Sequence, residues 1–451
     1  MCGIAGAAGK DAKIIVLNML EVLKHRGPDG SGIFSDGDIT LGNVLLKITG
    51  EESQPISNGG ALIYNGEIYN FSKIAKDLDI NTDSDSKTLF ALIRSRCIEN
   101  AIDRLDGDYA FAYFENGKII LVRDPAGVKP LYYAKGEVFA FASEKKALSI
   151  MGKNEIHALK PGYMLIYHAG SITEKKVTSF SPGKLLTIEN EARDMLYEAL
   201  EQSIRKRFHN PCAIAFSGGL DSSILAAVCK DAKLYSVGMP GSHDIKQTRY
   251  AARLLGLLDN LHLHEITMGE LESAIPDVIK AIESPDPLMI SIALPLYFAS
   301  KYAHLDGLRV ILSGQGADEL FAGYKRYESL NDEDLVKALR KDLENIALNN
   351  LERDDAVTMA NSVELRVPYL DKKVIELALS ISPELKIHNG IRKYILRLVA
   401  SKIIPDELVW KEKKAAQYSS GIYSAMEKLA RKNGYGRAMR NYLFDLMEKD
   451  Q

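Results

Sequence analysis

The first part of the chain alternates short apolar runs with Gly, Asn and Asp residues, a pattern typical of strands joined by turns. Apolar residues at helical spacing interrupt it twice, which predicts helices over residues 12–24 and 86–99. The sequence SFSPGK at 179–184 breaks the pattern, so we predict a linker there and a first domain of α+β class over residues 1–182. The predicted strands are 61–64, 109–114, 119–122 and 163–167.

Beyond the linker, strands alternate with helices. Asn190 is placed to cap a helix whose apolar residues recur at helical spacing up to Ile204. Each following strand is succeeded by a helix, which predicts a parallel α/β sheet. Beyond about Leu335 the pattern is mostly helical, and we assign residues 183–451 to this second domain. The predicted pairs are strand 213–216 with a helix from Leu220, strand 234–239 with helix 246–257, strand 261–266 with helix 271–283, and strand 310–312 with a helix through 318–321.

Composition narrows the classes of function. A net charge of -3 gives no electrostatic reason to expect nucleic acid or an anionic membrane as a partner. The four cysteines are far apart and form no C-x-x-C pair, so neither a disulfide framework nor a zinc site is expected. The chain has no apolar run of about 18 residues and no leader with a basic and then an apolar region, which predicts a cytoplasmic protein.

Cys2 stands directly after the initiator methionine. Its small side chain permits removal of Met1, which would leave one residue with both a thiol and a free α-amine. Because an α-amine titrates at about pH 8, it can act as the base for its own thiol, and no histidine is needed. On position alone, a disordered terminus that contains a cysteine is the commoner situation. The choice between a nucleophile and a disordered terminus therefore depends on the surrounding sequence.

Three ordered motifs support the nucleophile. MCGIAG at 1–6, HRGPDGSG at 25–32 and YNGEIYN at 64–70 resemble, in order and spacing, the class II glutamine amidotransferases, whose nucleophile is an N-terminal cysteine. The match covers most of the first 180 or so residues, whereas a lone Gly-Pro-Asp-Gly could be only a turn. The resemblance implies a fold of the N-terminal nucleophile hydrolase type, a sandwich with αββα layers.

The same resemblance assigns roles residue by residue. It implies that Cys2 attacks the side-chain amide of glutamine, and that the Asn65 side chain and the Gly66 backbone N–H form the oxyanion hole. A tetrahedral intermediate needs donors fixed where its negative charge develops, and one such donor is worth about 3 kcal/mol. Glu67 and Asp85 correspond to the groups that hold the α-ammonium of the substrate, and acidic side chains suit that cation.

One position departs from this family. Its members usually carry a strand resembling A-H-x-R-L-S-I, whose arginine binds the α-carboxylate of glutamine, whereas this chain has Leu45 there. Leucine cannot make the bidentate contact. Lys47, two residues on and predicted on the same strand face, could partly substitute; a solvated surface lysine is the alternative. Without a substitute, glutamine would bind weakly or ammonia would be used directly.

A second chemical site is predicted at residues 213–228, AIAFSGGLDSSILAAV. This is a buried strand, a Gly-rich turn and an amphipathic helix, an arrangement that presents backbone N–H groups and a helix N-terminus to phosphate. It lacks the lysine of the Walker loop. The string S-G-G-x-D-S instead resembles the loop of the ATP pyrophosphatases, which cleave ATP between its α and β phosphates.

Two further stretches, ILSGQGADELFAGY at 311–324 and VELRVPYLDKKVIELA at 363–378, resemble the asparagine synthetases specifically. The resemblance implies that Asp221 and Asp318 hold Mg²⁺, a hard cation that prefers carboxylate and phosphate oxygens. A helix N-cap is the alternative for Asp318. The residues implied to bind ATP, through its phosphates or through backbone contacts to the adenosine, are Phe216, Ser217, Gly218, Gly219, Asp221, Ser222, Val237, Ser313 and Gly314.

Two departures concern this second site. The asparagine synthetases usually read S-G-E-G-x-D-E, and Gln315 replaces the first glutamate here. The segment 410–421 resembles their R-x-K-x-Q-F-S-D-G loop with two extra residues. Lys413 is our candidate for the catalytic cation that neutralises the α-phosphate in the transition state, although Lys411 or Lys414 could take the role. A solvated charge run is the alternative.

Together the two sites predict a ligase that makes asparagine and hydrolyses glutamine. ATP, L-aspartate and L-glutamine would give asparagine, glutamate, AMP and diphosphate through aspartyl-AMP, and the resemblance implies an internal ammonia tunnel. The alternatives are an amidotransferase or cyclising ligase on the same scaffold that acts on another carboxylic acid, and a binding protein that keeps the fold without catalysis. The expected partners are these small-molecule substrates, with Mg²⁺ and with a homodimer as a possible assembly.

Overall fold

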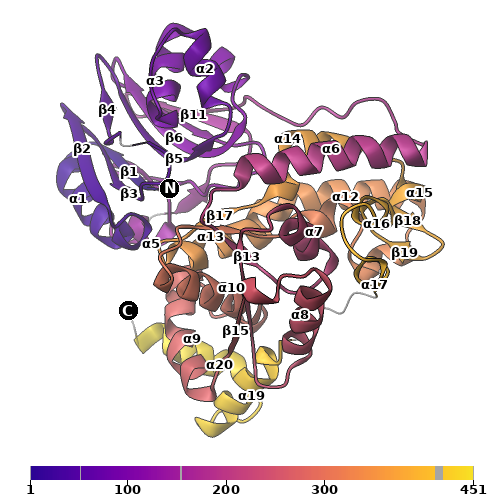
Figure 1. Cartoon of the computed structure of the whole chain (residues 1–451). Coiled ribbons are helices and arrows are strands. Elements are labelled where there is room, and N and C mark those ends of the chain that lie inside the picture. Colours follow the sequence, from indigo (N-terminus) through magenta and orange to yellow (C-terminus); the bar gives the residue numbers. More distant parts are fainter. Residues whose placement is uncertain (1, 51, 153–154, 412–419, 450–451) are drawn as a thin grey trace. The chain divides into compact units, whose positions relative to one another are not determined.

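The computed structural model describes residues 2–50, 52–152, 155–411 and 420–449. The chain divides into two compact units, residues 1–180 and 181–451 (Figure 1). Among the described residues, no helix is both long enough and apolar enough to span a bilayer.

The first unit contains two six-stranded sheets whose paired strands run antiparallel. One sheet has the strand order β10-β8-β9-β1-β3-β2, and the other has the order β12-β11-β7-β6-β5-β4. The strands are β1 Cys2–Ala8, β2 Gly30–Asp36, β3 Ile39–Leu45, β4 Ile56–Ser57, β5 Ala61–Ile68, β6 Gly107–Glu115, β7 Lys118–Arg123, β8 Tyr132–Lys135, β9 Phe139–Ala142, β10 Ile156–Ala158, β11 Tyr163–His168 and β12 Ser171–Lys176.

Apolar side chains divide this unit into four layers. Ile4 and Leu41 of one sheet pack against Ile63 and Ala112 of the other, so the two sheets lie face to face. Helices α1 and α5 cover the outer face of the first sheet, and α2 and α3 cover the second (Figure 1). Helix α4 packs into the same core as α2 and α3. The predicted αββα sandwich is confirmed. The helices are α1 Ala12–Leu23, η1 Lys24–Arg26, α2 Phe71–Asp77, α3 Asp85–Ser95, α4 Ile98–Ile102 and α5 Lys145–Ser149.

The helix predicted over residues 86–99 is two helices, α3 and α4. Helix α3 begins at Asp85, after Ser84, whose Oγ accepts the backbone N–H of Lys87 and caps the helix. It ends before Arg96, which has an extended backbone. The apolar spacing continues across this break because both helices face the same core, so periodicity alone could not reveal it.

The second unit contains a five-stranded sheet in the order β15-β14-β13-β16-β17, and all four strand pairs are parallel. The predicted parallel α/β sheet and the helical C-terminal part are therefore confirmed. The strands are β13 Ala213–Ala215, β14 Lys233–Gly238, β15 Leu261–Glu265, β16 Val310–Leu312 and β17 Glu364–Arg366, with a separate hairpin of β18 Ile387–His388 and β19 Ile391–Arg392.

Helices pack around this sheet: α10 contacts β13 and β14, α8 contacts β14 and β15, and α13 contacts β17. The α-helices of this unit are α6 Glu189–Arg207, α7 Leu220–Val228, α8 His243–Leu254, α9 Met268–Ile282, α10 Pro287–Leu305, α11 Ala317–Leu320, α12 Asp332–Ile346, α13 Glu352–Met359, α14 Lys372–Ser380, α15 Pro383–Lys386, α16 Tyr394–Ala400, α17 Asp406–Val409, α19 Ile422–Lys432 and α20 Met439–Lys449.

The predicted cap at Asn190 is wrong. Helix α6 begins at Glu189, and the preceding residue, Ile188, has an extended backbone and makes no side-chain cap. Asn190 therefore lies inside the first turn, between Glu189 and Glu191. These two acidic side chains suit the positive end of the helix dipole, and they mark the helix start without a capping side chain.

The order of the strands indicates which edge of the sheet would bind a ligand. From β13 the chain adds β14 and β15 on one side and then crosses to add β16 on the other, so the topological switch point lies between β13 and β16. In open parallel sheets, ligands bind at the carboxyl ends of the strands at such a point. The loops that follow these two strands are the SGG turn and the SGQG turn singled out in the sequence.

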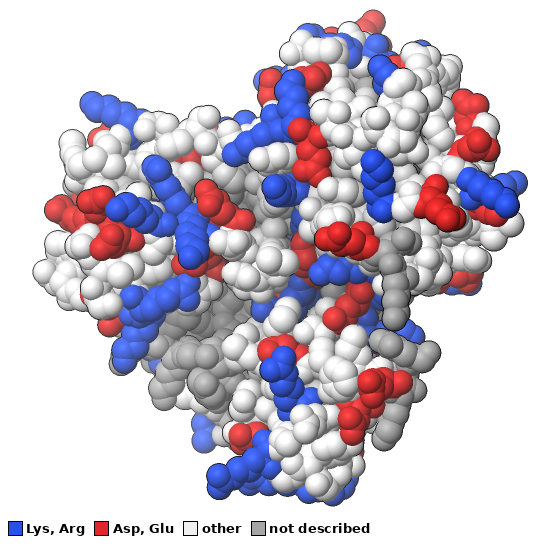
Figure 2. Space-filling view, turned by 180° about the vertical axis from the view of Figure 1, so that it is seen from behind, with Lys and Arg blue, Asp and Glu red and all other residues white. Residues whose placement is uncertain are grey.

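Charged side chains of both signs are mixed over the face drawn in Figure 2. Lysine and arginine lie next to aspartate and glutamate across this face instead of forming one continuous basic field. This mixture accords with the small net charge of -3.

Candidate active sites

Cys2 is the first residue of strand β1 and lies opposite Leu45 on the neighbouring strand β3. The residue is 4% exposed. Arg26 donates from Nε to the carbonyl oxygen of Cys2 at 3.3 Å and from Nη1 to Oε1 of Glu144 at 2.8 Å. The backbone that carries the thiol is therefore held both by the sheet and by a buried ion pair.

Glu144 is the shared partner of three basic side chains near Cys2. Lys146 Nζ lies 2.8 Å from its Oε2, and His25 Nε2 lies 3.1 Å from its Oε1. Burial opposes ionisation of this carboxyl, but Lys146, His25 and Arg26 together hold the pKa of Glu144 well below its ordinary value. Glu144 is therefore ionised near neutral pH, and the charge of Arg26 is engaged by it.

Asn65 on strand β5 brings a donor to the nucleophile. Its Oδ1 accepts the backbone N–H of Cys2 at 3.1 Å, so its Nδ2 points elsewhere. That nitrogen is buried and has no hydrogen-bond partner within the described part of the chain. Leaving such a donor unpaired costs about 1–3 kcal/mol, which suits a group reserved for an anion that forms only during a reaction.

Gly66 follows Asn65 and can only be glycine. Its φ of +154° lies in a region that side chains rarely adopt, and a Cβ atom there would lie 2.2 Å from the carbonyl oxygen of Asp108. Gly66 and Cys2 line the same pocket. The structure therefore brings together the three predicted residues of the hydrolytic site.

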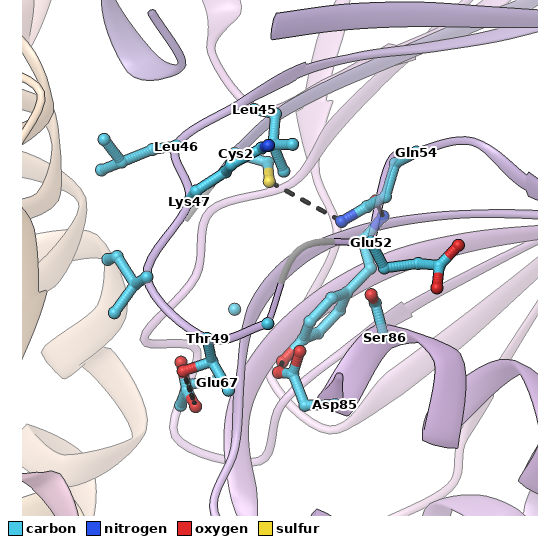
Figure 3. A pocket seen from close by; sticks show the side chains of 14 residues that line it. Cys2, Leu45, Leu46, Lys47, Thr49, Glu52, Gln54, Glu67, Asp85 and Ser86 are labelled. Atoms are coloured by element: carbon cyan, nitrogen blue, oxygen red, sulfur yellow. Dashed lines mark hydrogen bonds between the residues drawn. The ribbon is translucent and has the colours of Figure 1, made fainter. Parts of the chain in front are cut away.

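Two acidic residues, Glu67 and Asp85, line the pocket as well. Thr49 Oγ1 donates to Glu67 at 2.8 Å, while the Tyr64 hydroxyl and the Ile68 N–H donate to Asp85 at 2.8 and 3.2 Å. Burial, and then the charge of Glu67, raise the pKa of Asp85 to about 7. The pocket therefore favours a bound cation, as the predicted α-ammonium contact requires (Figure 3).

The predicted substitute for the missing arginine is placed differently from our expectation. Strand β3 ends at Leu45, so Lys47 lies beyond the strand, and the prediction of a shared strand face is wrong. The backbone N–H of Lys47 donates to a carboxylate oxygen of Asp29 at 2.8 Å, which draws the chain out of the strand. Leu45 and Lys47 nevertheless both line the pocket beside Cys2 (Figure 3).

The predicted phosphate-binding turn, residues 217–222, lies at the topological switch point of the second unit; we call it the phosphate loop. Gly218 has a φ of +67°, and a Cβ there would lie 2.9 Å from a backbone oxygen of helix α8, so glycine is required. The hydroxyls of Ser217 and Ser222 lie 3.2 Å apart and accept the N–H groups of Gly219 and Ser217, each at 3.3 Å. Helix α7 follows directly, so the loop ends at a helix N-terminus, which suits a phosphate.

Asp221 and Asp318 converge on Lys393, a residue that our sequence reasoning missed. Lys393 Nζ lies 2.7 Å from both carboxylate oxygens of Asp221 and 2.7 Å from Oδ1 of Asp318. Lys393 is only 3% exposed. Burial opposes its charge, yet the two aspartates raise the pKa of Lys393 above its ordinary value. A fixed cation therefore lies beside the phosphate loop.

Only a weak signal in the sequence marked this lysine. Arg392 and Lys393 form a basic pair before helix α16, but Lys393 is 172 residues from Asp221. Its φ of +56° is uncommon for a residue with a side chain and is typical of functional positions. The alternative of Asp318 as a helix N-cap is wrong, because the N-cap of α11 is Gly316.

The other predicted nucleotide contacts lie at strand ends. The backbone N–H groups of Phe216 and Ser313 donate to neighbouring strands at 2.8 and 3.0 Å, so their contacts to adenosine would have to use other atoms. Val237 lies in the parallel register of β14 and β15. A Cβ at Gly314 would lie 2.9 Å from the Cβ of Asp221, so the loop after β16 packs closely against the first turn of helix α7.

Gln315, the departure in the SGQG turn, is joined to a buried carboxylate. Its Nε2 donates to Oδ2 of Asp354 at 2.5 Å, and Arg353 Nε donates to the other oxygen, Oδ1, at 2.8 Å. Asp354 comes from helix α13, which packs against strand β17. The site therefore has an acidic group next to the neutral amide.

Lys413 and Lys414 lie outside the described residues, so only Lys411 can be placed. Its ammonium contacts Oε1 of Gln247 and lies 5.2 Å from the centre of the Tyr250 ring. Gln247 Nε2 in turn donates to the carbonyl oxygen of Gly218 at 2.8 Å. Lys411 is thus linked to the phosphate loop through one side chain.

Comparisons with known proteins match one family to each half of the chain. The glutamine amidotransferase domain family matches residues 1–197, and the asparagine synthase family matches residues 193–340 and 328–443. A Methanocaldococcus jannaschii protein, named provisionally as asparagine synthetase [glutamine-hydrolyzing] 1, is 37% identical over 100% of this chain and 99% of its own length.

Two further relatives are more distant. Asparagine synthetase B [glutamine-hydrolyzing] of Escherichia coli is 31% identical over 92% of this chain and 80% of its own length. Asparagine synthetase [glutamine-hydrolyzing] 1 of Bacillus subtilis is 29% identical over 92% of this chain and 86% of its own length. With both halves matched and with relatives aligned along nearly all of it, the chain belongs to the family of glutamine-hydrolysing asparagine synthetases.

Proposed function

We propose that this protein makes asparagine from aspartate, with ammonia released from glutamine at Cys2 and with ATP cleaved to AMP and diphosphate at the phosphate loop. Membership of the family supports the overall reaction. The observation that carries the first half is the buried, unpartnered Nδ2 of Asn65 beside the thiol. A cytoplasmic location and a homodimer stay predictions.

In the first half, removal of Met1 frees the α-amine of Cys2, which takes the thiol proton. The sulfur then attacks the side-chain carbonyl carbon of glutamine, and negative charge develops on the oxygen, where Asn65 Nδ2 and the Gly66 N–H donate to it. As this intermediate collapses, the α-amine of Cys2 gives the proton to the leaving nitrogen, which departs as ammonia and leaves a thioester. Water then hydrolyses the thioester to glutamate and regenerates the thiol. Glu67 and Asp85 hold the α-ammonium of the substrate during these steps.

In the second half, a carboxylate oxygen of aspartate attacks the α-phosphorus of ATP, and diphosphate leaves. Ammonia then attacks the acyl carbon of aspartyl-AMP and expels AMP. The N–H groups of the phosphate loop and the N-terminus of helix α7 cradle the phosphates. Lys393 adds a fixed positive charge beside the phosphates, while Lys413, which lies outside the described residues, stays the predicted cation for the α-phosphate. Lys411 and its link to Gly218 help to hold the loop.

Asp221 and Asp318 fit Mg²⁺ as the partner of ATP. Both contribute hard carboxylate oxygens, and the two carboxylates lie close together because the Nζ of Lys393 contacts both. The described residues contain no cluster of three or more His, Cys, Asp or Glu, so phosphate oxygens and water would have to complete the coordination. When bound, Mg²⁺ would supply positive charge to the phosphates; the two aspartates position it, and Lys393 remains their counter-ion.

The acid substrate is tested by mixing the protein with ATP, Mg²⁺, ammonia and one amino acid at a time. We expect diphosphate release with aspartate, because the chain belongs to a family named for asparagine, the amide of aspartate. Release with a different acid would favour another ligase on the same scaffold. Release with none of them would favour a binding protein.

The nitrogen donor is tested with Cys2→Ala. We expect loss of glutamine-dependent synthesis by at least about 10³-fold, since the nucleophile is removed, with ammonia-dependent synthesis unchanged. The intact mass should show that the active protein lacks Met1. Full glutamine use by Cys2→Ala, or retention of Met1 in active enzyme, would overturn the assignment.

A further inference from the structure

Gln54 lies directly beside the nucleophile, although no sequence motif drew attention to it. Its Nε2 is 3.8 Å from the Sγ of Cys2, within the range of a hydrogen bond to sulfur (Figure 3). Gln54 is 8% exposed and lines the same pocket as Cys2 and Gly66. The dashed line in Figure 3 joins these two side chains across the pocket.

The orientation of the Gln54 amide is fixed by the strand next to it. Its Oε1 accepts the backbone N–H of Tyr64 at 2.7 Å. The opposite orientation would place the NH₂ group against that N–H, donor against donor, and would lose this bond. The NH₂ group therefore faces the sulfur, and the 3.8 Å contact is a donor to Cys2.

The edge of strand β5 explains why a side chain fills this place. Strand β4 pairs with β5 only at Ala61 and Leu62. Tyr64 lies two residues further along β5, beyond the residues that pair with β4. Its backbone N–H donates to the side-chain oxygen of Gln54 in place of a strand partner. A Cβ at Gly32 would lie 2.2 Å from the carbonyl oxygen of Gln54, so strand β2 packs closely against this backbone. The donor is thus held from two sides.

We propose that Gln54 is a catalytic residue of the glutaminase reaction, which donates an N–H to the Cys2 sulfur and stabilises the thiolate before attack. Burial of a thiol disfavours its charged form, and Cys2 is almost fully buried. A neutral donor offsets this cost without adding a charge that would compete for Glu67 or Asp85. The proposal rests on Cys2 being the nucleophile.

The proton and charge balance follows from the geometry. The thiol proton goes to the α-amine, and the negative charge left on sulfur is shared with the Gln54 N–H. As the carbon–sulfur bond forms, this charge moves to the carbonyl oxygen of glutamine, where Asn65 and Gly66 donate. Gln54 stabilises the state before attack and Asn65 the state after it, so the two donors act in sequence.

Gln54→Glu separates the catalytic role from a structural one. The glutamate keeps an oxygen that can accept the Tyr64 N–H, but it replaces the donor that faces the sulfur with a second acceptor. We expect the pH midpoint of Cys2 alkylation by iodoacetamide to rise by about one to two units, the size expected for loss of a hydrogen bond to a charged group. Glutaminase kcat/KM near neutral pH should fall about ten- to a hundredfold and recover in part at higher pH.

The alkylation is measured in a Cys97→Ser background, because Cys97 is the exposed thiol whereas Cys212 and Cys229 are buried. Gln54→Leu, which removes donor and acceptor together, serves as the comparison for structural damage. The thermal unfolding midpoint should stay near that of the parent for Gln54→Glu and fall for Gln54→Leu.

Ammonia-dependent synthesis should be unchanged in all of these variants. An unchanged alkylation profile in Gln54→Glu would overturn the proposal, because the sulfur would then not feel the donor. The failure of the proposed function would look different: Cys2→Ala would keep its glutaminase activity, whatever the Gln54 variants do to the alkylation profile.

Discussion

The two candidate sites differ in the partners of their acidic side chains. In the Cys2 pocket the acidic groups Glu67 and Asp85 have hydroxyl and N–H donors, and burial, followed by the charge of Glu67, raises the pKa of Asp85 to about 7. At the phosphate loop the acidic groups Asp221 and Asp318 share the ammonium of Lys393. The two acidic groups of the first pocket suit a cation brought by the substrate, whereas those of the second site already share a lysine.

This difference predicts which change, in pH or in sequence, should alter the activity of each site. A pocket with a carboxyl that titrates near neutrality should respond to pH, because protonation removes its attraction for an ammonium. A site with a built-in counter-ion should respond to loss of that ion, because two partly buried carboxylates close together are costly without compensation. Each of the following changes is directed at one side of this contrast.

Lys393→Met should have the largest effect. It removes the cation from between Asp221 and Asp318 and from the phosphates, so we expect diphosphate release to fall by about 10²–10³-fold, the usual effect of removing one electrostatic stabiliser. Glutaminase activity should persist. Lys386→Met is the matched control, since Lys386 is also buried, and burial and Arg340 lower its pKa to about 7. Equal losses in both variants would show that Lys393 has no special role.

Gln315→Glu should disturb the second site instead of improving it. The new carboxylate would face Asp354, the present partner of the amide, and like charges at that distance resist joint ionisation. We expect a loss of about 1–3 kcal/mol in unfolding free energy together with reduced diphosphate release. Adding Asp354→Asn should recover most of the stability by restoring an amide–carboxylate pair. Additive losses in the double variant would contradict this coupling.

Leu45→Arg should strengthen the first pocket. An arginine there could bind the α-carboxylate of glutamine through a charge-assisted pair, so the KM for glutamine should fall about ten- to a hundredfold with kcat little changed. Lys47→Ala should raise KM if the lysine now contributes. Because Leu45 is 9% exposed, the unfolding midpoint is measured alongside. An unchanged KM in a stable Leu45→Arg variant would show that another cation binds the carboxylate.

The smallest effect is the pH dependence that Asp85 should impose. The pKa of this carboxyl is raised to about 7, so the group is increasingly neutral below that pH and ionised above it. An ammonium binds the ionised form, so the KM for glutamine should rise by up to about tenfold per unit as pH falls below about 7. Asp85→Asn should weaken binding and flatten the profile. A flat profile in the parent protein would contradict the raised pKa.

Much of the fold and of the first site could be predicted because the signals are local. The YNGEIYN motif identified Asn65 and Gly66, although the strand predicted over 61–64 continues through both residues as β5. The alternation of strands and helices also predicted the parallel sheet. Helix ends were less accurate: the helix predicted over 246–257 is His243–Leu254, because turn residues and caps, more than apolar spacing, decide where a helix begins.

The residues that reasoning from sequence missed are all brought in by tertiary packing. Lys393 lies 172 residues from Asp221, Gln54 lies 52 residues from Cys2, and Asp354 lies 39 residues from Gln315. None of them belongs to the motif that it serves. Lys47 was placed wrongly for a related reason, since its backbone bond to Asp29 ends the strand early.

The long separation between Asp221 and Lys393 has a consequence for the growing chain. Every contact described around the thiol lies within the first 146 residues, so all of these residues are synthesised before the second unit begins. The ammonium that neutralises Asp221 is added only 172 residues after that aspartate. Domains generally fold as units in the order of their synthesis, and distant pairings form slowly. The capacity to release ammonia would then arise before the capacity to use it.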